Sequence, residues 1–330
     1  MAMTDSQPRW RGRRIVGVGE AMLEFATVGE NLYRRGFAGD TLNTCWHVAQ
    51  LLGPHADVGY CTRVGNDAFS NQLVDFIAAN GMDTTRIARD TERTVGLYVI
   101  SLADAERSFS YWRESSAARR LADDLDALRD ALEDCALIHI SGITLAVIGE
   151  AGRRNLVRVL TEARGAGAIV SFDPNVRLKL WPDLDTLRDA TRGMLDATDI
   201  ALPSFDDEAL VWGDADPDAT VFRIAAAGVA EIVVKNGAGE VVALAGGVRA
   251  RIPAPVVTEI RDTTGAGDSF NAGYLAARYV GMPTREAVSI AQRVAGEVIG
   301  HFGALAPSEA LAGVRETIHG RAAASPLVSS

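Results

Sequence analysis

Short apolar runs alternate with amphipathic segments along most of the chain. Buried parallel strands are continuous apolar runs of about four to eight residues, whereas helices repeat apolar residues every three or four positions. This pattern predicts strands at 15–19, 56–61, 137–141, 168–173, 199–202 and 231–235, and a hairpin at 240–244 and 248–252. It predicts helices at 41–52, 67–80, 121–132, 150–164, 186–197, 283–301 and 308–318. The alternation favours an α/β fold with a doubly wound, mostly parallel sheet and helices on both faces.

A different pattern occupies residues 95–100 and 108–113, which are both strand-like and have only polar turn residues between them. Because no helix separates them, they predict a small antiparallel β insertion that hangs on the α/β body as a lid. Side chains alternate along a strand, so Phe109, Tyr111 and Arg113 share one face. Arg113 is then either a solvated residue of an edge strand or a ligand contact.

The predicted elements divide the chain into one large body and two short tails. Residues 13–320 are expected to form a single α/β domain, with lid strands from about 21–37 and 93–114. Residues 1–12 precede the first strand and 321–330 follow the last helix, so both segments are expected to be flexible tails.

The composition narrows the class of partner. The chain carries 33 basic and 43 acidic residues, a formal net charge of -10, whereas nucleic acids and anionic membranes favour a basic protein face. We therefore expect neither as the main partner, although an anionic small molecule needs only a local basic cluster. Cys45, Cys61 and Cys135 lack paired spacing, which argues against disulfides and zinc and favours a reducing cytoplasm. The longest apolar span, 136–148, is too short for a membrane helix.

Candidate catalytic and phosphate-binding residues are concentrated in residues 262–270, which read Asp-Thr-Thr-Gly-Ala-Gly-Asp-Ser-Phe. Gly265 and Gly267 lack the side chains that would keep an anion away from the backbone N–H groups. Apolar residues follow at helical spacing, and a helix start offers unpaired N–H groups and partial positive charge to a phosphate. Asp268 at this point either caps the helix or accepts the proton of an attacking hydroxyl group.

Other polar residues follow apolar runs at the same predicted edge of the sheet. Ligands of open α/β sheets bind beyond the carboxyl ends of the strands, where Arg177 and Lys235 are expected together with Asp268. Asp40 and Asn43 lie three positions apart at the start of the helix predicted at 41–52. Asp40 therefore either caps that helix or joins Asn43 in binding ligand hydroxyls.

The segment 262–270 resembles the C-terminal signature of the ribokinase/PfkB family of sugar kinases. The similarity extends over almost the whole chain and is sharpest to the bacterial 2-keto-3-deoxygluconate kinases of that family. It is carried by residues 36–44, 111–113, 141–143, 173–177 and 180–181. The resemblance implies a ribokinase-like fold and the ATP- and Mg²⁺-dependent phosphorylation of a six-carbon keto sugar acid at its terminal hydroxyl. It also makes a sugar acid and ATP the expected partners, and the exposed lid favours a homo-oligomer.

The resemblance implies a role for each matching residue. Asp268 is the implied base, and the backbone amides of Gly265, Ala266 and Gly267 form the implied anion hole. The implied substrate contacts are Gly39, Asp40, Asn43, Tyr98, Tyr111, Arg113, Asn175, Arg177 and Asp268. The implied nucleotide contacts are Asn175, Arg177, Ser204, Lys235, Gly237, Gly239, Gly265, Gly267 and Gln292. Asp207 stands where relatives organise Mg²⁺ through water, and Asp262 where some relatives bind K⁺ and others do without it.

The sequence itself favours an acid over a neutral sugar at one position. A carboxylate that leaves water is best matched by a planar guanidinium group, which can donate two parallel hydrogen bonds. Arg113, on the strand face shared with Tyr111, is the predicted carboxylate contact.

Three other functions compete with this interpretation. The same chemistry could act on fructose, ribose, a tagatose or gluconate derivative, or a nucleoside. A sensor of sugar acids without catalysis could use the same fold. A nicotinamide oxidoreductase is the most distant alternative, because Gly17 and Gly19 begin a Gly-x-Gly pattern in which Met22 takes the place of the third glycine.

Overall fold

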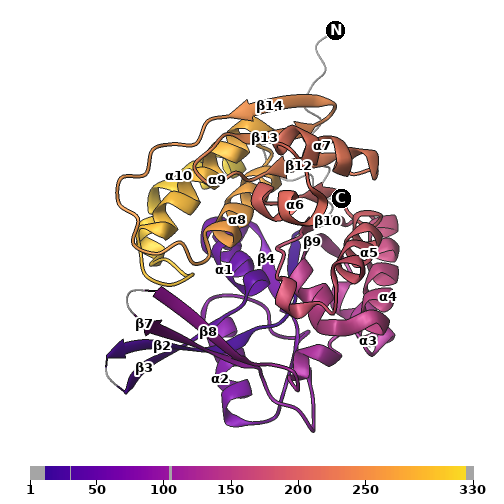
Figure 1. Cartoon of the computed structure of the whole chain (residues 1–330), viewed down its shortest axis with the longest axis vertical. Helices are drawn as coiled ribbons and strands as arrows, with labels where there is room; N and C mark the ends of the chain where they lie inside the picture. The colour runs from indigo at the N-terminus through magenta and orange to yellow at the C-terminus, as the bar shows by residue number, and fades with distance from the viewer. Residues whose placement is uncertain (1–11, 30, 104–105, 325–330) are drawn as a thin grey trace.

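A large twisted sheet forms the centre of the molecule in the computed structural model, which describes residues 12–324 except 30, 104 and 105 (Figure 1). Its eight strands follow the order β14-β13-β12-β11-β10-β9-β1-β4. Their bounds are Arg14–Val18 (β1), Asp57–Cys61 (β4), Cys135–Ser141 (β9), Ile169–Asp173 (β10), Ile200–Ala201 (β11), Glu231–Val234 (β12), Val241–Ala245 (β13) and Val248–Ile252 (β14). Neighbouring strands are parallel except for the pairs β12–β13 and β13–β14. The predicted mostly parallel sheet and its terminal hairpin are confirmed.

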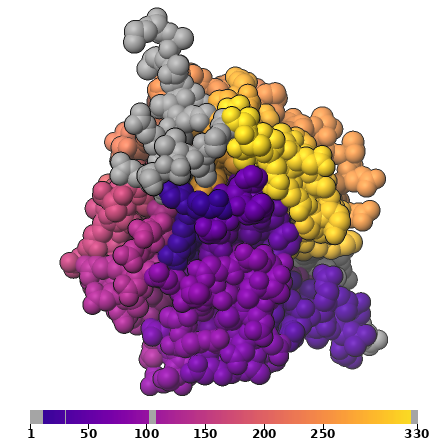
Figure 2. All heavy atoms as spheres, turned by 180° about the vertical axis from the view of Figure 1, so that it is seen from behind, coloured from indigo at the N-terminus to yellow at the C-terminus, as the bar shows by residue number. Residues whose placement is uncertain are grey.

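Helices cover both faces of this sheet, as the alternation predicts. Their bounds are Asp40–Leu52 (α1), Ala68–Ala79 (α2), Leu125–Leu132 (α3), Gly142–Ala166 (α4), Leu184–Leu195 (α5), Phe205–Trp212 (α6), Pro217–Ala226 (α7), Ala266–Tyr279 (α8), Thr284–Ile299 (α9) and Ala312–Ala324 (α10). Buried apolar side chains of α1, α2, α8, α9 and α10 form one core, and those of α3, α4, α5 and α7 form the other. Viewed from behind, α10 lies against the N-terminal third of the chain, where it packs on α1 (Figure 2).

A second, four-stranded sheet projects from one end of the molecule and is called the small sheet below (Figure 1). Its order is β3-β2-β7-β8, with bounds Leu32–Ala38 (β3), Met22–Gly29 (β2), Leu97–Ala103 (β7) and Glu106–Trp112 (β8). The predicted antiparallel pair 95–100 and 108–113 is present as β7 and β8. The sheet as a whole is mixed, because β2 and β7 both enter it from the large body and pair in parallel.

The structure departs from the sequence prediction at several helices. Helix α4 begins at Gly142 rather than at 150, and Gly149 interrupts it with non-helical dihedral angles (φ 68°, ψ -178°). The helices α6 and α7 were not expected. Helix α10 continues to Ala324, so the tail predicted from 321 is helical in its first four residues, while 1–11 and 325–330 lie outside the described residues. No helix within the described ranges is long and apolar enough to cross a membrane.

Candidate active site

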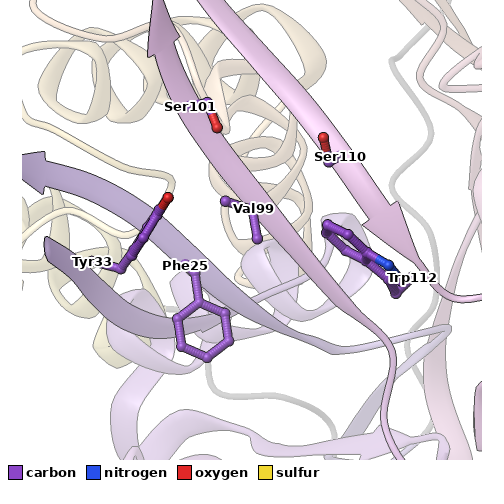
Figure 3. A pocket seen from close by; sticks show the side chains of 6 residues that line it. All are labelled: Phe25, Tyr33, Val99, Ser101, Ser110 and Trp112. Carbon is purple, nitrogen blue, oxygen red and sulfur yellow. The ribbon is translucent and has the colours of Figure 1, made fainter. Parts of the chain in front are cut away.

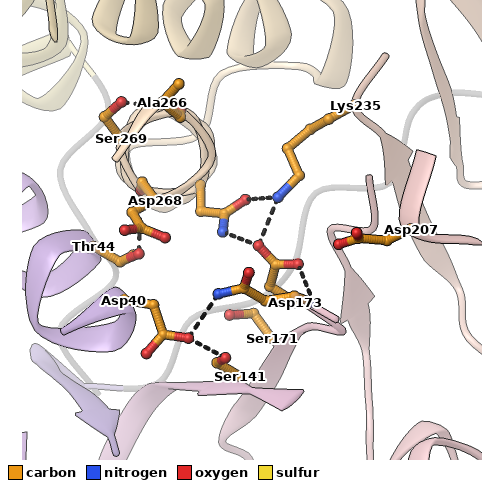
Figure 4. Close-up of polar contacts among 12 residues, drawn as sticks. Asp40, Thr44, Ser141, Ser171, Asp173, Asp207, Lys235, Ala266, Asp268 and Ser269 are labelled. Carbon is orange, nitrogen blue, oxygen red and sulfur yellow. Dashed lines mark hydrogen bonds and ion pairs between the residues drawn. The ribbon is translucent and has the colours of Figure 1, made fainter. Parts of the chain in front are cut away.

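The carboxyl ends of β9 and β10, the residue after β12, and the starts of α1 and α8 meet in one place (Figure 4). Ser141 ends β9, Asp173 ends β10 and Lys235 follows β12. Asp40 and Asp268 come from the first turns of α1 and α8. The structure therefore assembles predicted site residues at the edge where α/β sheets bind their ligands.

The glycine-rich turn before α8 has a backbone that other residues would not adopt. Gly265 caps the helix with φ 75°, and a Cβ atom there would lie 2.8 Å from the Cα atom of Ala304. The first helical hydrogen bond runs from the Ser269 N–H to the Gly265 carbonyl (2.8 Å), and the Ala266 N–H donates to Thr263 (3.2 Å). The N–H groups of Gly267 and Asp268 precede the first hydrogen bond of the helix. They are therefore suited to donate hydrogen bonds to an anion.

Asp268 is held in place by helix α1. Asn43 Nδ2 donates to its Oδ2 atom at 2.8 Å, and the Thr44 hydroxyl donates to its backbone carbonyl at 3.1 Å. The N-cap of α8 is Gly265, with no side-chain capping hydrogen bond. Asp268 is therefore not the helix cap, and the interpretation that gave it only that role is wrong.

The surroundings of Asp268 tune its acidity for proton transfer. Burial, together with the negative charges of Asp40 and Asp173, raises the pKa of Asp268 to about 7, although the Asn43 hydrogen bond and the Lys235 charge oppose the shift. A base is most effective when its pKa lies near the working pH. Asp268 can accordingly accept a proton near neutral pH and release it again.

A pH profile should report this titration. Because only the deprotonated carboxylate can act as base, kcat/KM should rise about tenfold per pH unit below pH ~7 and level off above it. Glu208 is a second carboxyl group whose pKa burial raises to about 7, and it is paired with Arg223 at 2.5 Å. The Glu208→Gln variant should show the same pH profile as wild type. That result would exclude Glu208 as the group whose titration the profile reports. A flat profile in wild type between pH 5.5 and 8.5 would contradict the assignment.

Asp40 anchors a second polar cluster beside Asp268. Its Oδ2 atom accepts hydrogen bonds from Asn175 Nδ2 (2.8 Å) and from the Ser141 hydroxyl, and its Oδ1 atom accepts the Thr41 N–H (2.9 Å). The N-cap of α1 is Gly39 rather than Asp40. Asn175 has a positive φ of 33°, a conformation uncommon outside glycine that often marks functional sites.

Lys235 and Asp173 form a buried ion pair behind the glycine turn. Lys235 Nζ lies 2.6 Å from Asp173 Oδ2 and 3.0 Å from Asn271 Oδ1, and Asn271 Nδ2 donates to the same carboxylate oxygen at 2.6 Å. Burial alone would raise the pKa of Asp173, but the Lys235 ammonium and these hydrogen bonds hold it below its usual value. A Cβ atom on Gly267 would lie 3.7 Å from Lys235 Nζ, so the ammonium group faces the glycine turn.

Two further predicted residues flank the Asp173 cluster. Asp207, in the first turn of α6, accepts the Val176 N–H at 3.0 Å, and burial raises its pKa (Figure 4). Arg177 is exposed and donates to the carbonyl of Val176 at 2.7 Å. Mg²⁺ is commonly bound by one or two carboxylates together with substrate phosphates. The carboxylate of Asp207 fits that role.

One face of the small sheet carries aromatic side chains. Tyr98 is 8% exposed, its ring centroid lies 5.7 Å from that of Tyr111, and its hydroxyl donates to Glu24. Burial raises the pKa of Tyr98, and the charges of Glu24 and Asp268 add to the shift. The contribution of Asp268 shows that this face of the small sheet lies within electrostatic range of that carboxyl group. Sequence reasoning missed Glu24, because it reaches Tyr98 only through the pairing of β2 with β7, and the two residues are 74 positions apart in the chain.

Arg113 is buried rather than solvated on an edge strand. Its side chain is 8% exposed and forms an ion pair with Glu20, whose side chain is 1% exposed. The Arg113 Cζ atom also lies 5.9 Å from the ring centroid of Tyr111. Sequence reasoning did not find Glu20, because the two residues are 93 positions apart in the chain.

Other predicted contacts are occupied by the chain itself or lie in loops. Gln292 Nε2 on α9 donates to the Pro253 carbonyl at 3.1 Å, and Gly237 and Gly239 lie between β12 and β13. Asp262 accepts hydrogen bonds from the N–H and hydroxyl of Thr264 (3.0 and 2.7 Å) and from the Gly303 N–H (2.7 Å). These contacts do not support a K⁺ site there. Within the described part of the chain, no group of three or more His, Cys, Asp or Glu side chains is arranged to hold a metal.

Known proteins resemble this chain in sequence and fold. A model described as pfkB family carbohydrate kinase matches residues 14–311. The chain is 38% identical over 306 residues to a 2-dehydro-3-deoxygluconokinase of Dickeya dadantii, covering 91% of this chain and 98% of the relative. It is 30% identical over 268 residues to fructokinase-2 of Oryza sativa, covering 78% and 77%. A protein of Escherichia coli described as ribokinase II, solved with ATP and Mg²⁺, matches 94% of this chain and 99% of its own with TM-score 0.80 and 24% identity.

Proposed function

Because the chain belongs to the pfkB family of carbohydrate kinases, we propose that it transfers the γ-phosphoryl group of ATP to the terminal hydroxyl of 2-keto-3-deoxygluconate. The products are 2-keto-3-deoxy-6-phosphogluconate and ADP. The observation that carries the proposal is Asp268, a carboxyl group with a pKa near 7 placed beside the glycine turn of α8. Relatives named for this activity support the choice of substrate.

The proposed mechanism uses groups already described. Asp268 takes the proton as the sugar oxygen attacks the γ-phosphorus and the bond from that phosphorus to the ADP oxygen breaks. The N–H groups at the start of α8 stabilise the charge on the transferring phosphoryl group. Asp207 would hold Mg²⁺ through water, and the ion when bound would supply neutralisation of the phosphate charge. The small sheet acts as the lid, which excludes water that would otherwise hydrolyse ATP.

The proposed substrate contacts lie around Asp40 and on the lid. Asp40, Asn43 and Asn175 present polar groups beside Asp268 for the sugar hydroxyls. Tyr98 and Tyr111 would cover the sugar from the lid. Arg113 would receive the carboxylate of the substrate, because a guanidinium group can hold one acidic partner in the protein and another in the ligand.

Replacing Arg113 should affect binding more than turnover. A hydrogen bond to a charged group contributes about 1.5–3 kcal/mol, so Arg113→Ala should raise the KM for the sugar acid roughly 10- to 100-fold and change kcat much less. Steady-state kinetics with saturating ATP measures both constants. Arg129→Ala, which removes a partly exposed arginine from its pair with Glu162, is the matched control. A fall in kcat at unchanged KM would remove Arg113 from this role.

A substrate panel tests the proposed function directly. Coupled ADP release should be measured for 2-keto-3-deoxygluconate, aldonic acids, fructose and ribose, with Asp268→Asn as the blank. We expect the keto-deoxy acid to have the highest kcat/KM. A higher value for fructose would favour the fructokinase alternative, to which the 30% identical rice enzyme points. Binding of the acid without ADP release would favour a sensor.

The lid is also the proposed contact between two copies of the chain. It exposes large apolar side chains on both faces, and a shallow hollow of about 400 Å³ on one face is lined by Phe25, Tyr33, Val99, Ser101, Ser110 and Trp112 (Figure 3). Exposed apolar sheet surfaces of this kind mark association sites. We expect a dimer by light scattering and a shift toward monomer in Trp112→Lys, whose indole is 59% exposed. A wild-type monomer at micromolar concentration would contradict this.

A further inference from the structure

The chain crosses between the large body and the lid at four points, and all four meet at Glu20. Glu20 lies where β1 passes into β2, and Gly39 lies where β3 passes into α1. A Cβ atom on Gly39 would lie 2.3 Å from the Glu20 carbonyl oxygen. Gly96 precedes β7, and a Cβ atom there would lie 3.0 Å from Glu20 Oε1 and 3.1 Å from Arg113 Cβ. Arg113 follows β8, so Glu20 occupies the hinge of the lid.

The Glu20 carboxylate depends on Arg113 for its charge. Its side chain is 1% exposed, burial raises its pKa, and the Arg113 charge is the largest opposing influence. A buried carboxylate is stable only when it is paired, because it has lost its hydration. The ion pair therefore fixes the position of each partner relative to the other.

This pair leaves hydrogen-bonding capacity on the arginine. Nε and Nη2 of Arg113 are buried, and Nη2 lies against Glu20 Oε2 in the ion pair. Guanidinium groups carry five N–H donors, so one carboxylate does not exhaust them. Arg113 can receive a second carboxylate while Glu20 holds it.

We propose that Glu20 is a positioning residue for the substrate's carboxylate: it orients the Arg113 guanidinium at the lid hinge and acts only through Arg113. This inference rests on the proposed function. A buried ion pair adds little stability compared with well-packed apolar residues. What the pair does provide is an arginine whose direction is set before the substrate arrives, which lowers the cost of ordering it on binding.

A double-mutant cycle tests the inference with Glu20→Gln, Arg113→Met and the two combined. Glu20→Gln should raise the KM for the sugar acid about tenfold, with kcat within about threefold of wild type and the KM for ATP unchanged. Arg113→Met should raise the KM further, and the combined variant should be no worse than Arg113→Met alone. Glu20→Asp, which keeps the charge, should recover part of the affinity. Glu162→Gln, in the exposed pair with Arg129, is the control and should behave as wild type.

Each remaining outcome has one meaning. Additive KM effects in the cycle, or a Glu20→Gln variant with lower thermal stability and unchanged KM, would overturn the positioning role. If Glu20→Gln fails to fold because it leaves a buried cation unpaired, Glu20→Asp takes its place in the cycle. Wild type that turns over no sugar acid would overturn the proposed function itself and this inference with it. Wild type that is active on the acid, with an additive cycle, would overturn this inference alone.

Discussion

Asp268→Asn should lower kcat by about 10²- to 10⁴-fold, the usual contribution of a general base. The amide has the size of the carboxylate and can still meet Asn43 at the start of α1, so the site should keep its shape. It cannot take the proton of the substrate hydroxyl. ATP affinity should therefore stay near the wild-type value, because the backbone N–H groups at the start of α8 remain.

The experiment combines coupled ADP release with calorimetric titration of ATP. Asp185→Asn, which changes an Asp whose side chain is 90% exposed on α5, is the matched control and should keep full activity. Retention of more than about a tenth of wild-type kcat in Asp268→Asn would show that another group, or water alone, removes the proton.

Lys235→Met should lower the free energy of unfolding by about 3–5 kcal/mol at pH 7, the usual effect of leaving one member of a buried ion pair without its partner. The remaining carboxylate of Asp173 would lie among buried groups with Asn271 as its side-chain donor. The low pKa of Asp173 should also rise toward or above its usual range, because the Lys235 charge that opposes burial is gone. Urea denaturation at pH 7 measures the loss.

The sign of the pH dependence provides a check on this explanation. In wild type, the pKa of Asp173 is lower in the folded chain than in the unfolded chain. Its carboxylate therefore stabilises the folded protein at pH values above the unfolded-state pKa, and this stabilisation is lost as the pH falls. The difference in free energy of unfolding between wild type and Lys235→Met should therefore become smaller at acidic pH. Combining Lys235→Met with Asp173→Asn should recover much of the stability, and Arg129→Met in an exposed pair should cost about 1 kcal/mol or less. A deficit below about 1 kcal/mol in Lys235→Met would contradict the buried pair as described.

The fold follows from the sequence wherever a pattern is local. The apolar runs of β1, β9 and β10 are buried on both faces, which gives them an uninterrupted signal. Helices α6 and α7 were missed because they are short, 8 and 10 residues. The parallel pairing of β2 with β7 brings together two segments that are far apart in the chain and that each enter the small sheet from the large body. No local sequence pattern predicts such a pairing.

The sequence predicted which residues gather at the candidate site better than it predicted which of their side chains contact one another. Asp40, Asn43 and Asp268 do meet, because strand ends and helix starts share one edge of an α/β sheet. The helix-cap alternatives for Asp40 and Asp268 fail because glycines 39 and 265 take the cap positions. The partner of Arg113 could not be predicted, since Glu20 reaches it only after the lid has folded onto the body.

The carboxylates gathered around the glycine turn imply a trade-off between stability and activity. Because the pKa of Asp268 in the folded chain is raised to about 7 from 3.8, the charged form is disfavoured by folding, and the protein loses stability as the pH rises through that value. A chain redesigned purely for heat resistance would neutralise this position and gain stability in alkaline solution. The same change would remove the base, so a thermostable catalyst has to find its added stability elsewhere in the fold.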